Sequence, residues 1–239
     1  MISKQDSIMY RVEDKFLCSV PDMYILQSKI SSVLRHDSNS MSRSGYKITS
    51  VYFDDYRDSN LSDTVDGVAA RKKYRARIYN DSFECIKLEV KYKLNSRVYK
   101  RTATINKEQL EQLMNGQPIT DDNPNMDNPL TMFNLAIKQD MLMPKVIVEY
   151  DRAAYVYSAG NVRITFDRAV RSSKDFARFL DNNRCKYRII SDVNQVLEVK
   201  YDQFVPGFIM QLLENGNMQQ ITFSKYQLCR QNEEVIICQ

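Results

Sequence analysis

In the segment Lys73–Ile78, which reads Lys-Tyr-Arg-Ala-Arg-Ile, basic and apolar residues alternate without a break. Successive side chains of a β-strand point to opposite faces, so the three basic residues share one face of the predicted strand. A solvated face normally mixes acids, bases and neutral polar residues, whereas this face holds three cations and no acid. The segment therefore predicts a strand with a self-repelling basic face, whose charge is neutralised by solvent or by a bound anion.

The same ordered alternation recurs in four other segments. In each of them, three polar or charged residues share one face of the predicted strand: Arg11/Glu13/Lys15, Glu89/Lys91/Lys93, Arg163/Thr165/Asp167 and Glu198/Lys200/Asp202. One such strand fits the solvated face of an open sheet. Five together favour a closed barrel with a charged interior that is hydrated or filled by a polyanion, because unpaired buried charges cost several kcal/mol each. Basic residues with interleaved glutamates then describe a site for phosphate chains and a divalent metal ion.

The remaining sequence predicts an α+β protein with a large antiparallel sheet. Nine segments have the residue content and the period of two that are typical of strands: Tyr10–Leu17, Lys47–Asp54, Lys72–Tyr79, Glu84–Lys93, Val98–Ile105, Lys145–Tyr155, Val162–Ala169, Val196–Phe204 and Gln220–Cys229. Helices are predicted, from their caps and their spacing of apolar residues, at Pro21–Leu34, Asn106–Asn115, Asn128–Leu142, Ser173–Asp181 and Pro206–Glu214. Loops are predicted at Gly116–Asn128 and Ser38–Gly45.

Composition excludes several classes of protein. The length of 239 residues suits one large domain or two small ones, and because the segments on both sides of Gly116–Asn128 are equally rich in strands, a single domain over residues 1–239 is expected. The chain holds 34 basic and 30 acidic side chains, a net charge of +4. The chain has one histidine, His36, which excludes a multi-histidine zinc site. His36 is expected on the surface, in a polar loop. A metal would therefore be bound by carboxylates, which suit Mg²⁺ or Mn²⁺. Five cysteines without a CxxC motif and the lack of a secretory or membrane-spanning segment indicate a reduced, cytoplasmic protein.

The order of several motifs resembles that of a known superfamily. The segment Tyr10–Phe16, which reads Tyr-Arg-Val-Glu-Asp-Lys-Phe, is similar to the opening R-x-E-x-K-[FY] strand of triphosphate tunnel metalloenzymes. Within that superfamily, six further segments resemble the polyphosphate polymerase domain of the vacuolar transporter chaperone (VTC): Val51–Asp54, Arg71–Tyr79, Val148–Arg152, Val162–Asp167, Leu197–Tyr201 and Phe223–Tyr226. The resemblance runs from Tyr10 to Arg230. It implies an eight-stranded antiparallel β-barrel tunnel flanked by helices, here expected as a stand-alone bacterial form without the regulatory domain and membrane helices of eukaryotic members.

The resemblance also implies ligands for phosphate and for metal. Phosphate would be held by Lys15, Arg75, Arg77, Lys91, Lys100, Arg152, Arg163 and Lys225, all of which except Lys100 are also expected to act in catalysis. Lys73 and Lys200 share the charged faces, where they either bind phosphate or form structural ion pairs. Glu198 matches the metal-binding glutamate of the family, and Glu13 and Glu89 are additional candidates for holding Mn²⁺ or Mg²⁺. Asp167 is expected to pair with a tunnel arginine.

The implied activity is that of a metal-dependent phosphotransferase. Polyphosphate polymerases transfer the γ-phosphate of ATP onto a growing inorganic polyphosphate chain. Phosphoryl transfer mainly needs positioning and charge neutralisation, so a chain with one histidine can perform it. Two alternatives use the same lining: a metal-dependent tri(poly)phosphate hydrolase and a non-catalytic polyphosphate-binding module. Nucleic acid is not expected, because +4 is a modest charge and no aromatic stacking face is evident; a peripheral membrane partner and the oligomeric state stay open.

Overall fold

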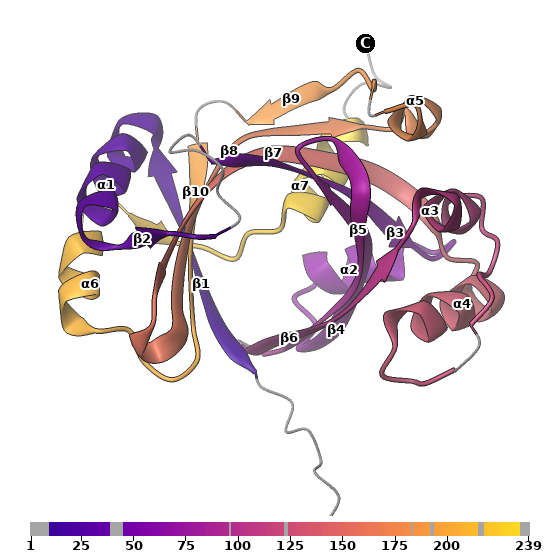
Figure 1. Cartoon of the computed structure of the whole chain (residues 1–239), viewed down its shortest axis with the longest axis horizontal. Helices are drawn as coiled ribbons and strands as arrows, with labels where there is room; N and C mark the ends of the chain where they lie inside the picture. Colours follow the sequence, from indigo (N-terminus) through magenta and orange to yellow (C-terminus); the bar gives the residue numbers. More distant parts are fainter. Residues whose placement is uncertain are drawn as a thin grey trace, which may run out of the picture.

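The computed structural model describes residues 10–38, 45–95, 97–121, 124–182, 184–191, 194–214 and 218–234. The strands among them form one antiparallel sheet, and eight close into a ring in the order β7-β3-β4-β5-β6-β1-β10-β8 (Figure 1). These eight are β1 (Arg11–Ser19), β3 (Tyr46–Asp54), β4 (Ala70–Tyr79), β5 (Ser82–Leu94), β6 (Arg97–Ile105), β7 (Met143–Tyr157), β8 (Val162–Ser173) and β10 (Asn194–Tyr201). The short strands β2 (Arg35–His36), β9 (Arg188–Ser191) and β11 (Gln219–Gln220) pair with β7, β8 and β1. The predicted eight-stranded fold is confirmed.

A tight turn sets the register of the β4–β5 hairpin. Asn80 and Asp81 both have positive φ, 49° and 59°, as a two-residue hairpin turn of type I′ requires. The flanking residues Tyr79 and Ser82 are paired. This register decides which charged side chains of β4 and β5 lie opposite one another inside the ring.

Helices cover the outside of the ring, where the apolar faces of the strands point. In Figure 1, α1 (Val20–Val33) and α6 (Gly207–Leu213) lie on one side, and α3 (Lys107–Met114), α4 (Pro129–Asp140) and α5 (Phe176–Leu180) on the other. Leu26 of α1 belongs to a core cluster with Leu197 of β10, and Phe133 of α4 belongs to a second one with Val90 of β5. The strands therefore bury their apolar face outward against helices and turn their charged face inward. No helix in the described ranges is long and apolar enough to cross a membrane.

Caps account for most of the predicted helix boundaries. Ser19 accepts a hydrogen bond from the Asp22 backbone N–H at the start of α1, and Asn106 and Gln109 form a reciprocal capping box at the start of α3. The helices predicted at Asn128–Leu142, Ser173–Asp181 and Pro206–Glu214 correspond to α4, α5 and α6.

The predicted strand Gln220–Cys229 is wrong. Its first residue belongs to β11, and the rest leads into the helix α7 (Lys225–Glu234). Ser224 starts this helix, because its hydroxyl accepts a hydrogen bond of 3.2 Å from the Gln227 backbone N–H. Tyr226 and Cys229 are both buried, at the spacing of one helical turn. A capped helix with two buried positions thus overrides the local preference for a strand.

Two smaller expectations also need correction. His36 is half-buried in β2, with its ring centroid 4.6 Å from that of Tyr155, and does not lie on an exposed loop. The strand expected at Val196–Phe204 ends at Tyr201. The helix α2 (Ser59–Val65) was not predicted. Residues 39–44 of the predicted loop Ser38–Gly45 lie outside the described residues.

Asp54, at the end of β3, ties α2 and α7 to the ring. Its fully buried carboxylate accepts hydrogen bonds from the backbone N–H groups of Asn60 and Leu61 (3.0 Å each) and from the Tyr226 hydroxyl (2.6 Å). We expect Asp54→Ala to lower the free energy of unfolding by about 3 kcal/mol, because several buried donors lose their acceptor. Urea denaturation measures this loss. The control is the neighbouring Asp55→Ala, which removes two hydrogen bonds that are less buried than those of Asp54 and should cost about 1 kcal/mol. Equal losses in the two variants would contradict the role given to Asp54.

Candidate functional site

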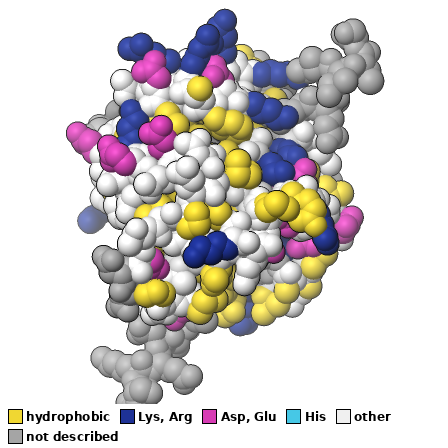
Figure 2. All heavy atoms as spheres, turned by 90° about the vertical axis from the view of Figure 1, so that its right-hand side faces the viewer, with side chains coloured by type: hydrophobic (Ala, Val, Ile, Leu, Met, Phe, Trp, Pro, Cys, Tyr) yellow, Lys and Arg dark blue, Asp and Glu magenta, His cyan; other side chains and the backbone are white. Residues whose placement is uncertain are grey.

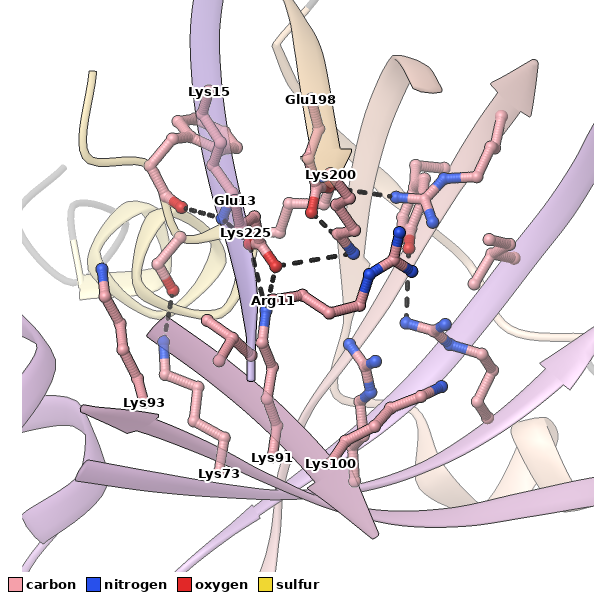
Figure 3. Close-up of a pocket in the computed structure, with 18 of the residues that line it drawn as sticks. Arg11, Glu13, Lys15, Lys73, Lys91, Lys93, Lys100, Glu198, Lys200 and Lys225 are labelled. Carbon is pink, nitrogen blue, oxygen red and sulfur yellow. Dashed lines mark hydrogen bonds and ion pairs between the residues drawn. The ribbon is translucent and has the colours of Figure 1, made fainter. Parts of the chain in front are cut away.

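The interior of the ring is a cavity of about 1290 Å³ with a strongly basic wall (Figure 3). All of the predicted phosphate ligands lie on that wall: Lys15, Lys73, Arg75, Arg77, Lys91, Lys100, Arg152, Arg163, Lys200 and Lys225. Glu13 and Glu198 lie on it too, whereas Glu89 stands behind it. The outer face over α3 and α4, shown in Figure 2, instead mixes apolar, basic and acidic side chains. The ordered charge of the strands is thus a property of the interior.

Glu13, on β1, is surrounded by lysines. Its carboxylate lies 2.9 Å from Lys91 Nζ, 3.0 Å from Lys15 Nζ and 3.5 Å from Lys200 Nζ. Burial opposes ionisation, but the positive charges of these lysines, that of Lys200 foremost, hold the pKa of Glu13 well below its ordinary value. Glu13 is therefore an ionised carboxylate at which β1, β5 and β10 meet.

Glu198, on β10, is a second buried carboxylate, with 4% of its surface exposed. It lies 2.7 Å from Lys200 Nζ and 3.5 Å from Arg152 Nη2. Burial and the charge of Glu13 raise its pKa, but nearby cations, Lys200 foremost, outweigh them, so the pKa of Glu198 is lowered. Glu198 is ionised as well.

These two carboxylates form a pair that fits a divalent cation. Across β1 and β10, Glu13 is opposite Lys200 and Lys15 is opposite Glu198, so the two glutamates are diagonal neighbours that share Lys200 as a partner. Their ionised oxygens are the hard donors that Mg²⁺ and Mn²⁺ prefer. The described residues contain no group of three or more His, Cys, Asp or Glu side chains that could hold a metal ion. Further ligands would come from phosphate oxygens and water, as is usual for Mg²⁺.

Glu89, on β5, balances part of the arginine wall. It is 1% exposed, and its two oxygens lie 2.6 Å from Arg75 Nε and 2.6 Å from Lys100 Nζ. Despite burial, the charges of Arg75, Arg77 and Lys100 hold the pKa of Glu89 well below its ordinary value. The expected self-repulsion is therefore wrong for Arg75, because its counter-charge comes from the neighbouring strand.

Arg152, on β7, pairs with Asp167 of β8, as expected. Two hydrogen bonds, from Nε to Oδ1 (2.6 Å) and from Nη2 to Oδ2 (2.7 Å), form a bidentate contact. Lys225, the first residue of α7, reaches the same carboxylate at 2.5 Å. Burial opposes the ionisation of Asp167, but Arg152 and Lys225 keep its pKa below the ordinary value. Asp167 thus holds two of the predicted phosphate ligands in place.

The other two arginines differ in their partners. Arg163 Nη2 lies 2.8 Å from Asp37 Oδ2 and 3.0 Å from the Tyr46 hydroxyl. Arg77 is buried, and its closest polar partners are hydroxyl groups, those of Ser50 at 3.4 Å and Tyr150 at 3.5 Å. Within the described residues Arg77 makes no ion pair, so its charge is available to a ligand.

Lys73 is a second cation without an acidic partner. Its Nζ donates a hydrogen bond of 2.7 Å to the Ser224 hydroxyl, and no carboxylate in the described part of the chain is paired with it. Burial and the charges of Lys15 and Lys91 hold its pKa well below the ordinary value. Between this lowered pKa and the unfolded value near 10.4, the unfolded state binds more protons, so the free protein gains stability as pH rises through that window.

We expect phosphate-chain binding at pH 9 to be accompanied by proton uptake. A bound polyanion favours the ammonium form of Lys73 and raises its pKa, so the neutral fraction takes up protons. Titration calorimetry of metal-free protein with tripolyphosphate, in two buffers of different ionisation enthalpy, counts these protons. Lys73→Met should take up fewer, by up to about one proton. An uptake equal to that of the wild type would show that Lys73 does not change its charge on binding.

Several residues of the wall had not been given a role as ligands. Arg11 and Lys93 were placed on the charged faces without such a role, and the period of two extends to Arg71 as well; all three line the wall. Asp37 had no such signal, because its contact with Arg163 joins residues far apart in the sequence. The segment between β11 and α7 also reaches the site (Figure 1), where the Phe223 carbonyl accepts a hydrogen bond of 2.8 Å from Lys15.

Comparison with protein families gives one match that covers nearly the whole chain. The family model described as VTC domain matches residues 10–232. A search of curated proteins finds no significant match.

Comparison with solved structures gives distant matches over most of the chain. A Bacillus halodurans protein proposed to be an adenylate cyclase has 14% identity and a TM-score of 0.53, with 90% of this chain and 94% of that chain covered. A protein from Pyrococcus horikoshii has 14% identity and a TM-score of 0.48, with 93% and 99% covered. The mimivirus capping enzyme triphosphatase has 12% identity and a TM-score of 0.37, with 86% and 85% covered. The similarity to the first of these proteins is one of fold alone.

Proposed function

The chain belongs to the VTC domain family, with the triphosphate tunnel fold, and on this premise we propose that it is a polyphosphate polymerase. In this proposal it transfers the γ-phosphate of ATP onto a growing inorganic polyphosphate chain inside the basic cavity, with Mn²⁺ or Mg²⁺ bound. The observation that carries the proposal is the cavity wall itself, where the buried Arg77 and the half-buried Lys73 are cations with no ion-pair partner among the described residues. Because unpaired buried charges are costly, such a wall is suited to a polyanion.

We assign the following roles. Phosphate binding falls to Lys15, Lys73, Arg75, Arg77, Lys91, Lys100, Arg152, Arg163, Lys200 and Lys225, which line the cavity. Glu198 and Glu13 would hold the metal ion, which would supply a Lewis acid for the phosphate oxygens. Glu89, unlike Glu13 and Glu198, does not line the cavity, and its oxygens are held by Arg75 and Lys100, so we assign it to positioning Arg75 rather than to the metal.

For this reaction the protein mainly has to position the phosphates and neutralise their charge. A terminal oxygen of the polyphosphate chain attacks the γ-phosphorus of ATP, the bond to the bridging β–γ oxygen breaks, and ADP leaves with the electron pair. The attacking oxygen is already largely ionised, so no side chain has to remove a proton. Fixed cations such as Arg77 and Arg152 hold the donor and acceptor phosphates together and neutralise the charge on the transferred group.

Phosphorus-31 NMR tests the proposal directly. Purified protein is incubated with ATP and Mn²⁺, with EDTA-treated protein as the control. A growing resonance of internal phosphates together with ADP supports the polymerase. Orthophosphate without a chain signal would replace it with a tri(poly)phosphate hydrolase. Salt-sensitive polyphosphate binding without turnover would replace it with a binding module. A cytoplasmic location is part of the proposal, because the reaction consumes ATP.

A further inference from the structure

A row of basic residues lies across the strand ends at one mouth of the cavity. Arg71 is opposite Lys93 on β4 and β5, Lys93 is opposite Val98 on β6, and Val98 is opposite Arg11 on β1. Arg71 and Val98 are each the second residue of their strand, Lys93 is the last but one, and Arg11 is the first. All four line the cavity wall. We call the pair Arg71 and Lys93 the rim pair.

The rim pair and Lys73 behind it form a group of cations that no carboxylate among the described residues neutralises, whereas Lys91 and Lys100 pair with Glu13 and Glu89. Like charges directly opposite one another destabilise a sheet, and the next row inward is again basic, with Lys73 opposite Lys91 and Lys91 opposite Lys100. Arg71 donates a hydrogen bond to the Val68 carbonyl (2.6 Å), and within the described residues neither member of the rim pair makes an ion pair. Figure 3 shows Lys93 and Lys73 projecting into the same space.

The opposite end of the cavity has a different charge arrangement. There Tyr46 lies against Tyr79, the last residue of β4, with ring centroids 6.0 Å apart. The Tyr46 hydroxyl binds Arg163, whose charge is balanced by Asp37 at 2.8 Å.

Toward this end the wall also holds Lys87, opposite Arg77, which donates a hydrogen bond to the Thr104 hydroxyl (3.0 Å) and makes no ion pair within the described residues. An anionic chain that extends out of the cavity therefore meets two adjacent unbalanced cations at the rim pair and a single one, Lys87, toward the other end.

We propose that the rim pair is an outer subsite for the phosphoryl groups of a long polyphosphate chain, and that it makes the protein prefer long chains to triphosphates. This inference rests on the proposed polyphosphate chemistry. The basic positions of β4 from Arg71 to Arg77 cover roughly 20 Å at about 3.3 Å per residue. A triphosphate held at Arg75 and Arg77 does not reach this far, whereas a longer chain contacts both the inner cations and the rim pair.

The test removes the two charges and compares two ligands. Dissociation constants are measured by titration calorimetry, without divalent metal and at fixed ionic strength, for tripolyphosphate and for long-chain inorganic polyphosphate. The variant is Arg71→Gln with Lys93→Gln. The matched control is Lys72→Gln, which removes a cation one residue along β4 on the opposite face, where the exposed Lys72 side chain lies over the Tyr74 ring.

We expect the double variant to lose about tenfold more affinity for the long chain than for tripolyphosphate. Lys72→Gln should leave the ratio of the two affinities unchanged. Equal losses for both ligands, no loss for either, or a wild type that binds neither would overturn the subsite. If the double variant does not fold, as judged by its melting temperature, Lys93→Gln alone is compared in the same way. The NMR experiment separates the two proposals. If the wild type prefers long chains, the double variant loses that preference and neither protein turns over ATP, the subsite is kept and the polymerase is rejected.

Discussion

Glu198→Gln lowers the rate of metal-dependent ATP turnover by about a hundredfold or more while the protein stays folded, if the proposed roles hold. The substitution keeps the size of the side chain and removes the charge that a divalent cation would bind. Glu198 is 4% exposed and lies 2.7 Å from Lys200, which also lies 3.5 Å from Glu13. Lys200 therefore keeps a carboxylate partner in the variant. Turnover is measured as ADP release over a Mn²⁺ titration, with the melting temperature of the same samples.

A buried glutamate outside the cavity provides the control for this experiment. Glu149 is 3% exposed and pairs with Arg171 at 2.8 Å, but it does not line the cavity. Glu149→Gln removes a buried, ion-paired carboxylate of the same kind, so we expect it to lower stability and to leave the Mn²⁺ dependence of turnover unchanged. Wild-type turnover in Glu198→Gln would remove Glu198 from the metal role. An equal loss in both variants would show that the effect is structural.

The ring and most of its lining could be predicted from local sequence. The period of two places alternate residues of a strand on one face whatever the strand pairs with, so Arg75, Arg77 and Lys91 were identified as lining residues before any pairing was known. The charged side is the inside because the apolar side needs helices to cover it, and those helices were evident from their caps. The charged faces of five strands favoured a closed barrel over an open sheet, and the resemblance to VTC domains then supplied its eight-stranded form.

Contacts between strands could not be predicted in the same way. Glu89 meets Arg75 only because the turn at Asn80 and Asp81 sets that register, and a shift of one residue would turn every side chain to the other face. The contact between Asp37 and Arg163 joins residues that are 126 positions apart. Charge balance inside the ring is therefore a property of register and closure.

The C-terminal segment shows the limit of the strand pattern itself. Ile221, Phe223 and Lys225 alternate as strand residues do, yet Ser224 caps a helix and Tyr226 is buried from its first turn. Lys225 still lines the wall, where it pairs with the buried Asp167, so the predicted ligand is at the site although the predicted element is wrong. Lys225 shows that a residue at the start of a helix can line the cavity just as residues on the strands do.

Arg75→Met lowers the free energy of unfolding by about 3 kcal/mol or more, because it leaves Glu89 buried with Lys100 as its only remaining ion-pair partner among the described residues. The basic row of β4 alone would suggest the opposite, a gain from relieved repulsion. Arg77→Met is the matched control, since Arg77 faces the same side two residues on and has hydroxyl partners at 3.4 and 3.5 Å. Its loss should be smaller, about 1 kcal/mol, because Arg77 makes no direct ion pair and acts on Glu89 only at longer range, and because the repulsion by Arg75 is relieved.

A double-mutant cycle attributes this cost to the buried ion pair. Glu89→Gln alone leaves Arg75 and Lys100 without their shared carboxylate, which lies 2.6 Å from each, and should also cost about 3 kcal/mol. Arg75→Met combined with Glu89→Gln removes both charges, so we expect it to cost about 2 kcal/mol less than the sum of the single variants. Urea denaturation of the four proteins gives the coupling. Additive losses would mean that packing dominates, and a rise in stability for Arg75→Met would mean that repulsion along β4 outweighs the pair.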